Sequence, residues 1–446
     1  MPPPVGMLHG GRPLGNEVKD TISIGILGLG VVGSGTVAVL EKNRDAIERK
    51  VGARLLIRRI AVRDLRKKRA VTVDRSLLTN NPLEVLDDPS IDIICELIGG
   101  VSPAKEFILR AFANGKHVVT ANKELIAKEG HAIMEEAARR KLDFQFEGSV
   151  GGGIPIIQPM KNALAGNAVQ EVMGIVNGTT NYILTRMACE GIDFETALRE
   201  AQARGYAEAD PSSDVEGFDA QYKIAILSSI AFLSRVFVQD VYVEGITHIT
   251  QRDIECAQEL GYVIKLVGIA NRVGDDGMQV RVHPALLPAS HPLASTNDVY
   301  NAIYLRGDAV GDVMFYGRGA GMMPTGSAVV GDIMDVCRNI LHGATSRITC
   351  TCFEQRRMLP MDVVETKYYI RMLVADRPRV LASIAGVLGD HEVSIESVVQ
   401  KAAVGGRAEI VWVTHRVREA NMRAALELIK KLPCVERVEN WLRVEE

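Results

Sequence analysis

The sequence predicts an α/β protein built from three domains. Its 446 residues are about three times the length of a typical domain of ~150 residues. From Thr21 to about residue 150, short apolar strands alternate with helices, which is typical of a parallel sheet covered on both faces. Long helices followed by closely connected strands then indicate an α+β domain, and the order strand, helix, strand, strand, helix, strand after residue 365 indicates a third domain.

The composition favours a soluble protein that acts on small molecules. Hydrophobic residues make up 47% and charged residues 24% of the chain, and the net charge is only −3, so neither disorder nor charge-driven nucleic-acid binding is expected. We find no apolar stretch long enough for a membrane span and no signal peptide. Seven scattered cysteines without a C-x-x-C pair favour reduced thiols. We therefore expect a cytoplasmic protein with a flexible tail at residues 1–20.

The first predicted domain covers residues 21–150. An apolar strand at 22–28, a helix running to about residue 49 and a strand at 55–62 form one βαβ unit. The same alternation continues to residue 147. Strands are expected at 91–99, 117–123 and 142–147, with one helix at 103–115 and a second that runs to about residue 140. This order predicts a Rossmann-type parallel sheet.

A glycine motif, GLGVVGSG (28–35), lies between the first strand and the first helix. In this context one glycine forms the tight turn, the next lets the backbone approach a pyrophosphate, and the third packs the helix on the strand. The alternative is an ordinary glycine-rich turn. The motif predicts a dinucleotide-binding domain, with cofactor contacts from Gly28, Gly30, Val31, Val32 and Gly33.

A basic cluster follows the second strand, where a site for NAD usually carries an acid for the ribose 2′-hydroxyl. Arg63 and Lys67 at this strand end suit a 2′-phosphate, so we expect NADP(H) to be preferred over NAD(H). Asp64 could still serve NAD, and the cluster could also be a solvated charge run.

The second predicted domain covers residues 151–317. Its apolar helix at 223–233 is followed by strands at 262–270, 278–287, 301–307 and 312–317. A glycine-rich stretch leads into a helix at about 327–341, and we expect residues 318–341 to pack back on the first domain. Residues 342–365 show no periodic pattern and are predicted to form a linker to the third domain at 366–446.

A dense acidic segment, GYAEADPSSDVEGFDAQYK (205–223), opens the apolar helix. Asp219 and Lys223 stand four residues apart, in the favourable order for an ion pair on one helix face. A lysine that leads an apolar helix is partly desolvated, which lowers its pKa towards values useful in acid/base catalysis. Lys223 is therefore a catalytic candidate, and the alternative is a surface ion pair beside an acidic loop.

Two further segments are candidate sites. Gly99 and Lys123 lie at the carboxyl ends of predicted parallel strands, where open α/β sheets bind their ligands, although Lys123 could also be a solvated lysine. The segment FEGSVGGGIP (146–155) offers Glu147 and several free carbonyls at the domain junction. It could be a hinge or a site for a hard monovalent cation.

These motifs, together with TANK (120–123), NGTTNYIL (177–184) and DRPRVLASIAGVL (376–388), identify a family resemblance. From residue 21 to 446 the chain resembles homoserine dehydrogenase with a C-terminal ACT domain. The resemblance implies hydride transfer between NAD(P)(H) and the pair L-aspartate 4-semialdehyde and L-homoserine, in threonine, methionine and isoleucine biosynthesis. It also assigns substrate binding and dimerisation to the second domain, in a homodimer or homotetramer.

The resemblance further implies roles for single residues. Lys223 would donate and accept the proton, with Lys123 as a second lysine beside the reacting oxygen and near the cofactor. The substrate-binding residues would be Glu208 and Asp219, to which we add Asp214. The remaining implied cofactor contacts are Gly99, Gly178 and Gly321. A sodium-like ion would be held by the Glu147 side chain and the carbonyls of Val150, Gly152 and Ile154.

The resemblance implies threonine as an amino-acid effector of the ACT-like domain. One departure is that Arg379 stands where the first turn usually has glycine, which could reshape the effector pocket. Two other functions remain possible: a catalytically silent sensor of dinucleotide and amino acid, and a dehydrogenase for another amino acid or hydroxy acid. The intact set of Lys123, Glu208, Asp219 and Lys223 favours an enzyme. We also expect a chain that ends near Glu365 to remain active.

Overall fold

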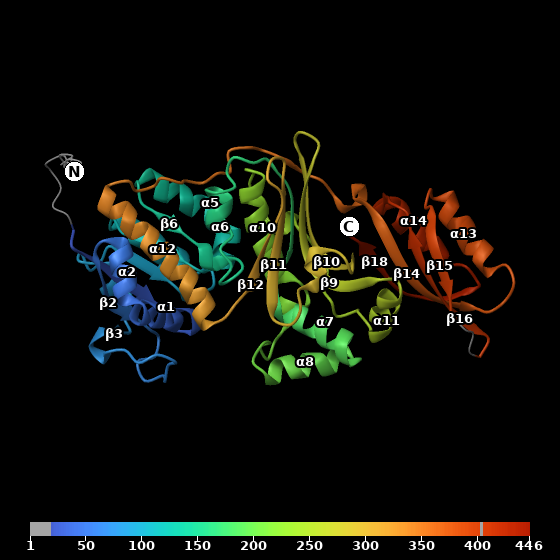
Figure 1. Cartoon of the computed structure of the whole chain (residues 1–446), viewed down its shortest axis with the longest axis horizontal. Helices are drawn as coiled ribbons and strands as arrows, with labels where there is room; N and C mark the ends of the chain where they lie inside the picture. The colour runs from blue at the N-terminus through green and yellow to red at the C-terminus, as the bar shows by residue number, and fades with distance from the viewer. Residues whose placement is uncertain (1–18, 402–404) are drawn as a thin grey trace, which may run out of the picture.

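The computed structural model describes residues 19–401 and 405–446, so most of the predicted tail at 1–20 lies outside the described residues. The chain forms an elongated molecule (Figure 1), with the N-terminal domain at one end and the C-terminal domain at the other. Within the described ranges, no helix has the length and apolarity to cross a membrane.

The first domain has the predicted Rossmann-type parallel sheet. Its described strands follow the order β3-β2-β1-β4-β5-β6, and every neighbouring pair is parallel. The strands are β1 (Thr21–Leu27), β2 (Arg54–Ala61), β3 (Leu78–Thr79), β4 (Ile93–Glu96), β5 (His117–Thr120) and β6 (Phe144–Gln145).

Helices cover both faces of this sheet because successive strand residues, which point to opposite faces, are apolar. In β4, Ile93 packs in one core cluster with the first helices, whereas Ile94 packs in the other. The helices are α1 (Val31–Lys42), α2 (Arg44–Val51), α3 (Leu83–Leu86), α4 (Ala104–Ala113) and α5 (Lys123–Arg139). The single helix expected up to residue 49 is thus two helices that meet at Asn43.

The second domain is built on a mixed sheet. Strands β12-β11-β7-β9-β10 lie side by side, with antiparallel pairing between neighbours. Its strands are β7 (Val169–Ile175), β8 (Tyr242–Val243), β9 (Tyr262–Val273), β10 (Gly277–Pro288), β11 (Tyr300–Gly307) and β12 (Gly311–Arg318). Its helices are α6 (Ile157–Lys161), α7 (Gly178–Glu190), α8 (Phe194–Ala203), α9 (Ser212–Val215), α10 (Phe218–Ala231) and α11 (Gln251–Glu259).

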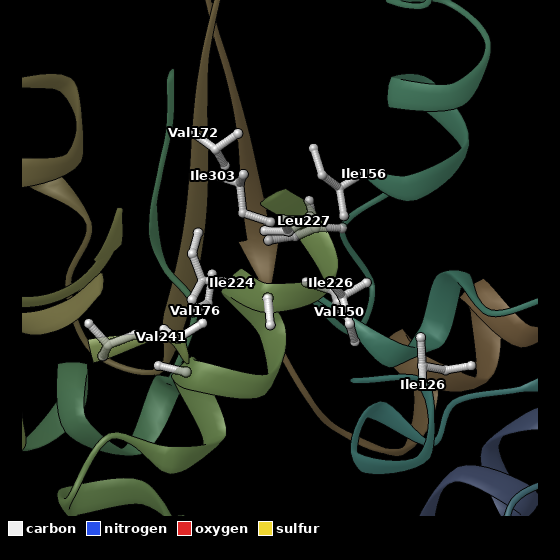
Figure 2. Packing of buried hydrophobic residues seen from close by; sticks show 14 of the residues in the cluster. Ile126, Val150, Ile156, Val172, Val176, Ile224, Ile226, Leu227, Val241 and Ile303 are labelled. Carbon is white, nitrogen blue, oxygen red and sulfur yellow. The ribbon is translucent and has the colours of Figure 1, made fainter. Parts of the chain in front are cut away.

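Helix α10 lies in the junction between the first two domains (Figure 2), which explains why most of its residues are buried. Ile224 packs near Val176 and Val241, towards the mixed sheet, whereas Ile226 lies near Val150. The first turn of this helix carries Asp219 and the second carries Lys223, so a rigid, buried element positions both residues.

Helix α12 (Met322–His342) returns to the first domain and packs along α1, as expected, but it begins five residues earlier than predicted. The two helices approach closely because glycines face each other. A Cβ on Gly35 would overlap the Met322 carbonyl, and a Cβ on Gly326 would lie 2.7 Å from the backbone nitrogen of Thr36.

The C-terminal domain has the βαββαβ order of an ACT domain and sheet order β18-β14-β16-β15. Its elements are β14 (Glu365–Ala375), α13 (Val380–Asp390), β15 (Ile395–Gln400), β16 (Arg407–Thr414), β17 (Val417–Arg418), α14 (Glu419–Ile429) and β18 (Val435–Val444). Strand β18 also pairs in parallel with β10, so the sheets of the second and third domains are continuous.

The segment at 342–365 is more firmly attached than a linker. Its short strand β13 (Arg357–Met358) pairs with β10, and Glu354 bridges to Ser234. These contacts use the extended backbone, which explains why the side chains carry no periodic pattern. The C-terminal domain is therefore joined to the second domain by backbone pairing as well as by the chain.

Candidate active site

The glycine motif forms a tight turn between β1 and α1. Gly28 has φ of +99°, which favours glycine, and its N–H donates to the Ala61 carbonyl at 2.9 Å. A Cβ on Gly33 would overlap the Gly28 carbonyl, whereas a Cβ on Gly30 would meet no atom within 4 Å. Val31 is 65% exposed at the start of α1. The turn therefore leaves an open space at a helix N-terminus, which fits a dinucleotide pyrophosphate.

The basic cluster lies beside this turn. β1 and β2 are paired at Leu27 and Ala61, and Arg63 follows two residues later. Arg63 and Lys67 are both exposed, and neither forms an ion pair within the described part of the chain. The Asp64 carboxylate accepts a hydrogen bond from the backbone of Arg66 at 2.8 Å. The side chains of Arg63 and Lys67 are therefore unpaired within the described ranges and lie where the adenosine ribose of a bound dinucleotide is expected.

The loop after β4 is fixed by a buried carboxylate that sequence reasoning missed. Glu96 is fully buried and accepts hydrogen bonds from the Ile98 backbone at 2.9 Å and the Thr120 hydroxyl at 2.8 Å. Asn122 donates to the Gly100 carbonyl at 2.6 Å. An acid that ends an otherwise apolar strand was the available signal. These contacts hold the predicted Gly99 segment beside the start of α5.

Two lysines from different domains meet at one carboxylate. Asp219 is only 2% exposed, and its Oδ2 lies 2.6 Å from the Nζ of Lys223. Lys123, the first residue of α5, forms an ion pair with the other carboxylate oxygen and keeps 42% of its side chain exposed. Lys223 also donates to the Val176 carbonyl at 2.6 Å. The structure thus brings together Lys123, Asp219 and Lys223.

Asn177 completes this cluster. The sequence pointed to this residue only as part of the NGTTNYIL motif. Its Nδ2 donates to Asp214 Oδ1 at 2.7 Å and to Asp219 Oδ2 at 2.8 Å, and its Oδ1 caps α7 through Thr180. The asparagine directly before a glycine helix start was a sequence signal for the cap, but not for the two carboxylates.

The electrostatics separate the two lysines. Burial is the largest influence on Lys223 and lowers its pKa, and the nearby charge of Lys123 lowers it further. Burial is also the largest single influence on Lys123 and acts to lower its pKa, but the charge and hydrogen bond of Asp219, together with the charges of Asp214 and Glu208, outweigh burial and raise the pKa. Burial would raise the pKa of Asp219, yet the two lysines hold it low. Lys223 is therefore the lysine that loses its proton more easily.

The predicted substrate carboxylates differ in their surroundings. Burial raises the pKa of Asp214, and the charge of Asp219 adds to this effect. Glu208 is exposed, and its carboxylate has no hydrogen-bond partner among the residues that the structure describes. It contributes to the electrostatic environment of Lys123 without touching the lysine. The structure therefore places Glu208 at the rim, outside the hydrogen-bonded cluster.

The other predicted cofactor glycines begin helices. Gly178 is the first residue of α7, and a Cβ there would lie 2.8 Å from the Val299 carbonyl. Gly321 precedes α12 with φ of +121°. Asn301 lies against neighbouring Gly319, and both polar atoms of its buried amide lack a hydrogen-bond partner in the described chain. Sequence reasoning gave no signal for Asn301.

The predicted cation loop differs in one respect from expectation. The Glu147 carboxylate accepts hydrogen bonds from the backbone N–H groups of Ile156, Ile157 and Gln158 at 2.5, 2.8 and 2.7 Å. Its side chain thus caps α6, because an acidic group satisfies the free N–H groups of a helix start. The Val150, Gly152 and Ile154 carbonyls accept no hydrogen bond from the described residues. The three carbonyls are thus free of hydrogen bonds within the described chain, whereas the Glu147 carboxylate also serves the start of α6.

Comparisons with known proteins agree with this geometry. Residues 28–147 match the NAD-binding domain of homoserine dehydrogenase, residues 155–334 match homoserine dehydrogenase, and residues 368–434 match the ACT domain. A homoserine dehydrogenase from Synechocystis is 46% identical over 95% of this chain and 99% of its own length.

Solved structures show the same similarity. A homoserine dehydrogenase from Thiobacillus denitrificans has a TM-score of 0.89 and 43% identity over 96% of this chain and 98% of its own. A hyperthermophilic archaeal homoserine dehydrogenase variant in complex with NADPH has a TM-score of 0.61 and 26% identity, over 71% of this chain and 97% of its own. This chain belongs to the homoserine dehydrogenase family, with a C-terminal ACT domain.

Proposed function

We propose that Lys223 is the proton donor and acceptor of the enzyme, assisted by Lys123. The enzyme interconverts L-aspartate 4-semialdehyde and L-homoserine with a nicotinamide dinucleotide, which supplies or accepts the hydride when bound. The observation that carries the assignment is the contact of both lysines with Asp219. Protonated Lys223 would donate to the carbonyl oxygen during reduction, and neutral Lys223 would accept the hydroxyl proton during oxidation.

The acidic residues around the lysines suit an amino-acid substrate. Homoserine carries an ammonium group, which buried carboxylates would bind. Asp214 and Asp219 are joined through Asn177, which fixes their spacing. We assign them to the ammonium and place Glu208 as an additional contact from the rim.

The test is Lys223→Ala. We expect kcat to fall by at least ~100-fold, because a positioned acid/base group contributes this much, while cofactor affinity measured by fluorescence stays near wild type. Lys128→Ala is the matched control, since this lysine pairs with Glu124 on the surface of α5. A Lys223→Ala enzyme that kept most of its kcat would remove Lys223 from the mechanism.

We propose a preference for NADP(H), supported by the exposed Arg63 and Lys67 beside the glycine turn. The archaeal relative described above is a complex with NADPH. Replacement of both residues by alanine should weaken NADPH binding much more than NADH binding, because only NADPH carries the 2′-phosphate. Lys50→Ala, on the exposed side of α2, is the control. Equal losses of affinity for NADPH and NADH would show that the basic cluster is a solvated surface that does not bind the 2′-phosphate.

We also propose a monovalent cation such as sodium at the Val150, Gly152 and Ile154 carbonyls. Carbonyl oxygens are suitable ligands for a hard cation, and these three are free of hydrogen bonds from the described residues. The Glu147 carboxylate would be the acidic ligand of the ion while its oxygens also cap the start of α6.

Threonine binding at the C-terminal domain and a homodimer or homotetramer are further proposals. A cavity of about 300 Å³ is lined by the turn Asp376–Arg379. The edge strand β12 exposes Met314 and Tyr316, and exposed apolar side chains on a sheet edge suit contact with a second copy. All seven cysteines are free in the structure, which supports a reducing, cytoplasmic location.

A further inference from the structure

A buried arginine crosses the boundary between the C-terminal domain and the second domain. Arg443 lies in β18, where it pairs with Ala285 of β10 (Figure 1) and is only 1% exposed. Its guanidinium donates to Glu419 of its own domain at 2.7 and 2.6 Å. Its Nη1 donates instead to Glu244 of the second domain at 3.0 Å. One side chain therefore links a carboxylate from each domain.

Glu244 is held on several sides. Its backbone N–H donates to the Val282 carbonyl at 2.9 Å, and its carboxylate accepts the Tyr242 hydroxyl at 3.0 Å. Burial alone would raise the pKa of Glu244, but the hydrogen bond with His248 and the charge of Arg443 lower it to about 2. The carboxylate is therefore ionised at any pH at which the enzyme works, and the link to Arg443 is a permanent ionic contact.

The segment that carries Glu244 packs against the turn between the substrate carboxylates. The Ile246 N–H donates to the Val215 carbonyl at 2.8 Å. A Cβ on Gly245 would lie 2.6 Å from the Cα of Glu216, and a Cβ on Gly217 would lie 3.0 Å from Val243. Backbone touches backbone here. A shift of the Glu244 segment must therefore move Val215–Gly217, which connect Asp214 to Asp219.

We propose that Glu244 is a positioning residue through which the C-terminal domain sets the geometry of the substrate carboxylates. Arg443 fixes Glu244, and the backbone of Gly245 and Ile246 fixes the turn at 215–217. The inference rests on the proposed function in one respect, namely that Asp214 and Asp219 bind the substrate. The glycine turn at 28–33 belongs to the first domain, whereas Glu244 and Val215–Gly217 belong to the second, so we expect the effect to be larger for the amino-acid substrate than for the dinucleotide.

The test is Glu244→Gln, which removes the charge and keeps the shape. We expect KM for homoserine to rise about fivefold or more, while KM for NADP⁺ stays within about twofold, because Asp214 and Asp219 are assigned to the amino acid and not to the dinucleotide. Glu365→Gln is the matched control: it breaks the exposed Arg418–Glu365 pair of the same domain and should change neither KM.

Arg443→Lys provides the second variant. Glu244→Gln and Arg443→Lys break the same contact, so the double variant should raise KM for homoserine no more than the stronger single variant. Additive effects, equal rises in KM for both substrates, or a lower melting temperature with both KM values unchanged would overturn the proposal.

Asp214→Asn, measured in parallel, separates this proposal from the proposed function. If Asp214→Asn leaves KM for homoserine unchanged, the substrate role of Asp214 is wrong, and the positioning role loses its basis. If Asp214→Asn raises KM and Glu244→Gln does not, the substrate role stands and the positioning role of Glu244 is overturned.

Discussion

Asp219 accepts two lysines, and this sharing determines which of them can exchange a proton. Lys223 is buried and pays the larger desolvation penalty, whereas Lys123 keeps part of its side chain in solvent. A single carboxylate cannot neutralise both cations fully. Burial and the charge of Lys123 therefore still disfavour the protonated form of Lys223. This arrangement provides an acid/base group whose pKa lies below that of an ordinary lysine.

The pH dependence of Lys123→Met tests this coupling. In the proposed mechanism, oxidation of homoserine requires neutral Lys223, so kcat/KM should rise with pH through the pKa of Lys223. Removal of the Lys123 charge favours protonated Lys223, raises its pKa, and should move the rising limb to higher pH. The measurement is the pH profile of kcat/KM, with Lys128→Met as a control that should not shift it. A shift to lower pH, or none, would contradict the coupling.

Contacts between residues at a fixed spacing in one helix could be predicted from the sequence. Contacts between residues far apart in the chain could not. The spacing of Asp219 and Lys223 was sufficient to predict their ion pair, which the structure contains. The role of Glu147 depends on the free N–H groups at the start of α6, and that short helix carries no sequence signal of its own. Asn177 likewise gains its role from Asp214, 37 residues away.

At the scale of elements, the contact between α1 and α12 ties the returning helix to the first domain. Gly326→Ala should destabilise the protein by about 1–3 kcal/mol, because its Cβ would press against the backbone of Gly35 and Thr36. The matched control is Gly331→Ala in the same helix, where a Cβ meets no atom within 4 Å and alanine should stabilise by about 0.5–1 kcal/mol.

Thermal unfolding of the two variants measures this contrast. Loosening of α12 should also weaken cofactor affinity, because Gly321 at its start is a proposed cofactor contact. Equal unfolding temperatures for Gly326→Ala and Gly331→Ala would show that the two helices are not in close contact.

Elements with strong periodicity were predicted well, and those defined by pairing were not. The parallel sheet and the strands β9 to β12 follow from apolar runs and turn residues. Helix α10 is buried on almost every side because it lies between domains. Its mostly apolar sequence predicts the burial but not the elements that cover it. The parallel pairing of β18 with β10 joins residues far apart in the chain and leaves no local signal.

At the scale of the whole molecule, buried charges join the C-terminal domain to the rest. Asp253 of α11 is fully buried and pairs with Arg371, and Arg281 of β10 pairs with Glu445. A chain that ends at Glu365 would lose both partners as well as Arg443. Removal of one partner from a buried ion pair costs about 3–5 kcal/mol, because the other charge stays buried. These buried charges therefore favour a less stable enzyme when the chain ends at Glu365, whereas its activity stays a prediction.

We predict that the chain truncated at Glu365 unfolds at a clearly lower temperature than the full-length enzyme and binds homoserine less tightly. The archaeal homoserine dehydrogenase structure matches only 71% of this chain with 97% of its own length, so a lower stability here would reflect these specific buried charges rather than a general need for a chain of this length. The measurements are thermal unfolding and KM for homoserine and NADP⁺. Unchanged values for the truncated chain would show that the continuous sheet contributes nothing to the substrate site.

Threonine titration of the full-length enzyme tests the sensor role of the C-terminal domain. We expect inhibition, through a coupling of about 1–3 kcal/mol between effector and substrate sites. Arg379 is critical, because it lines this cavity of about 300 Å³ and adopts φ of +75°, a conformation that costs a non-glycine residue about 1–2 kcal/mol. If the full-length enzyme is insensitive and Arg379→Gly restores inhibition, the arginine blocks the pocket. If neither responds, the domain serves the substrate site by holding Glu244, not by sensing threonine.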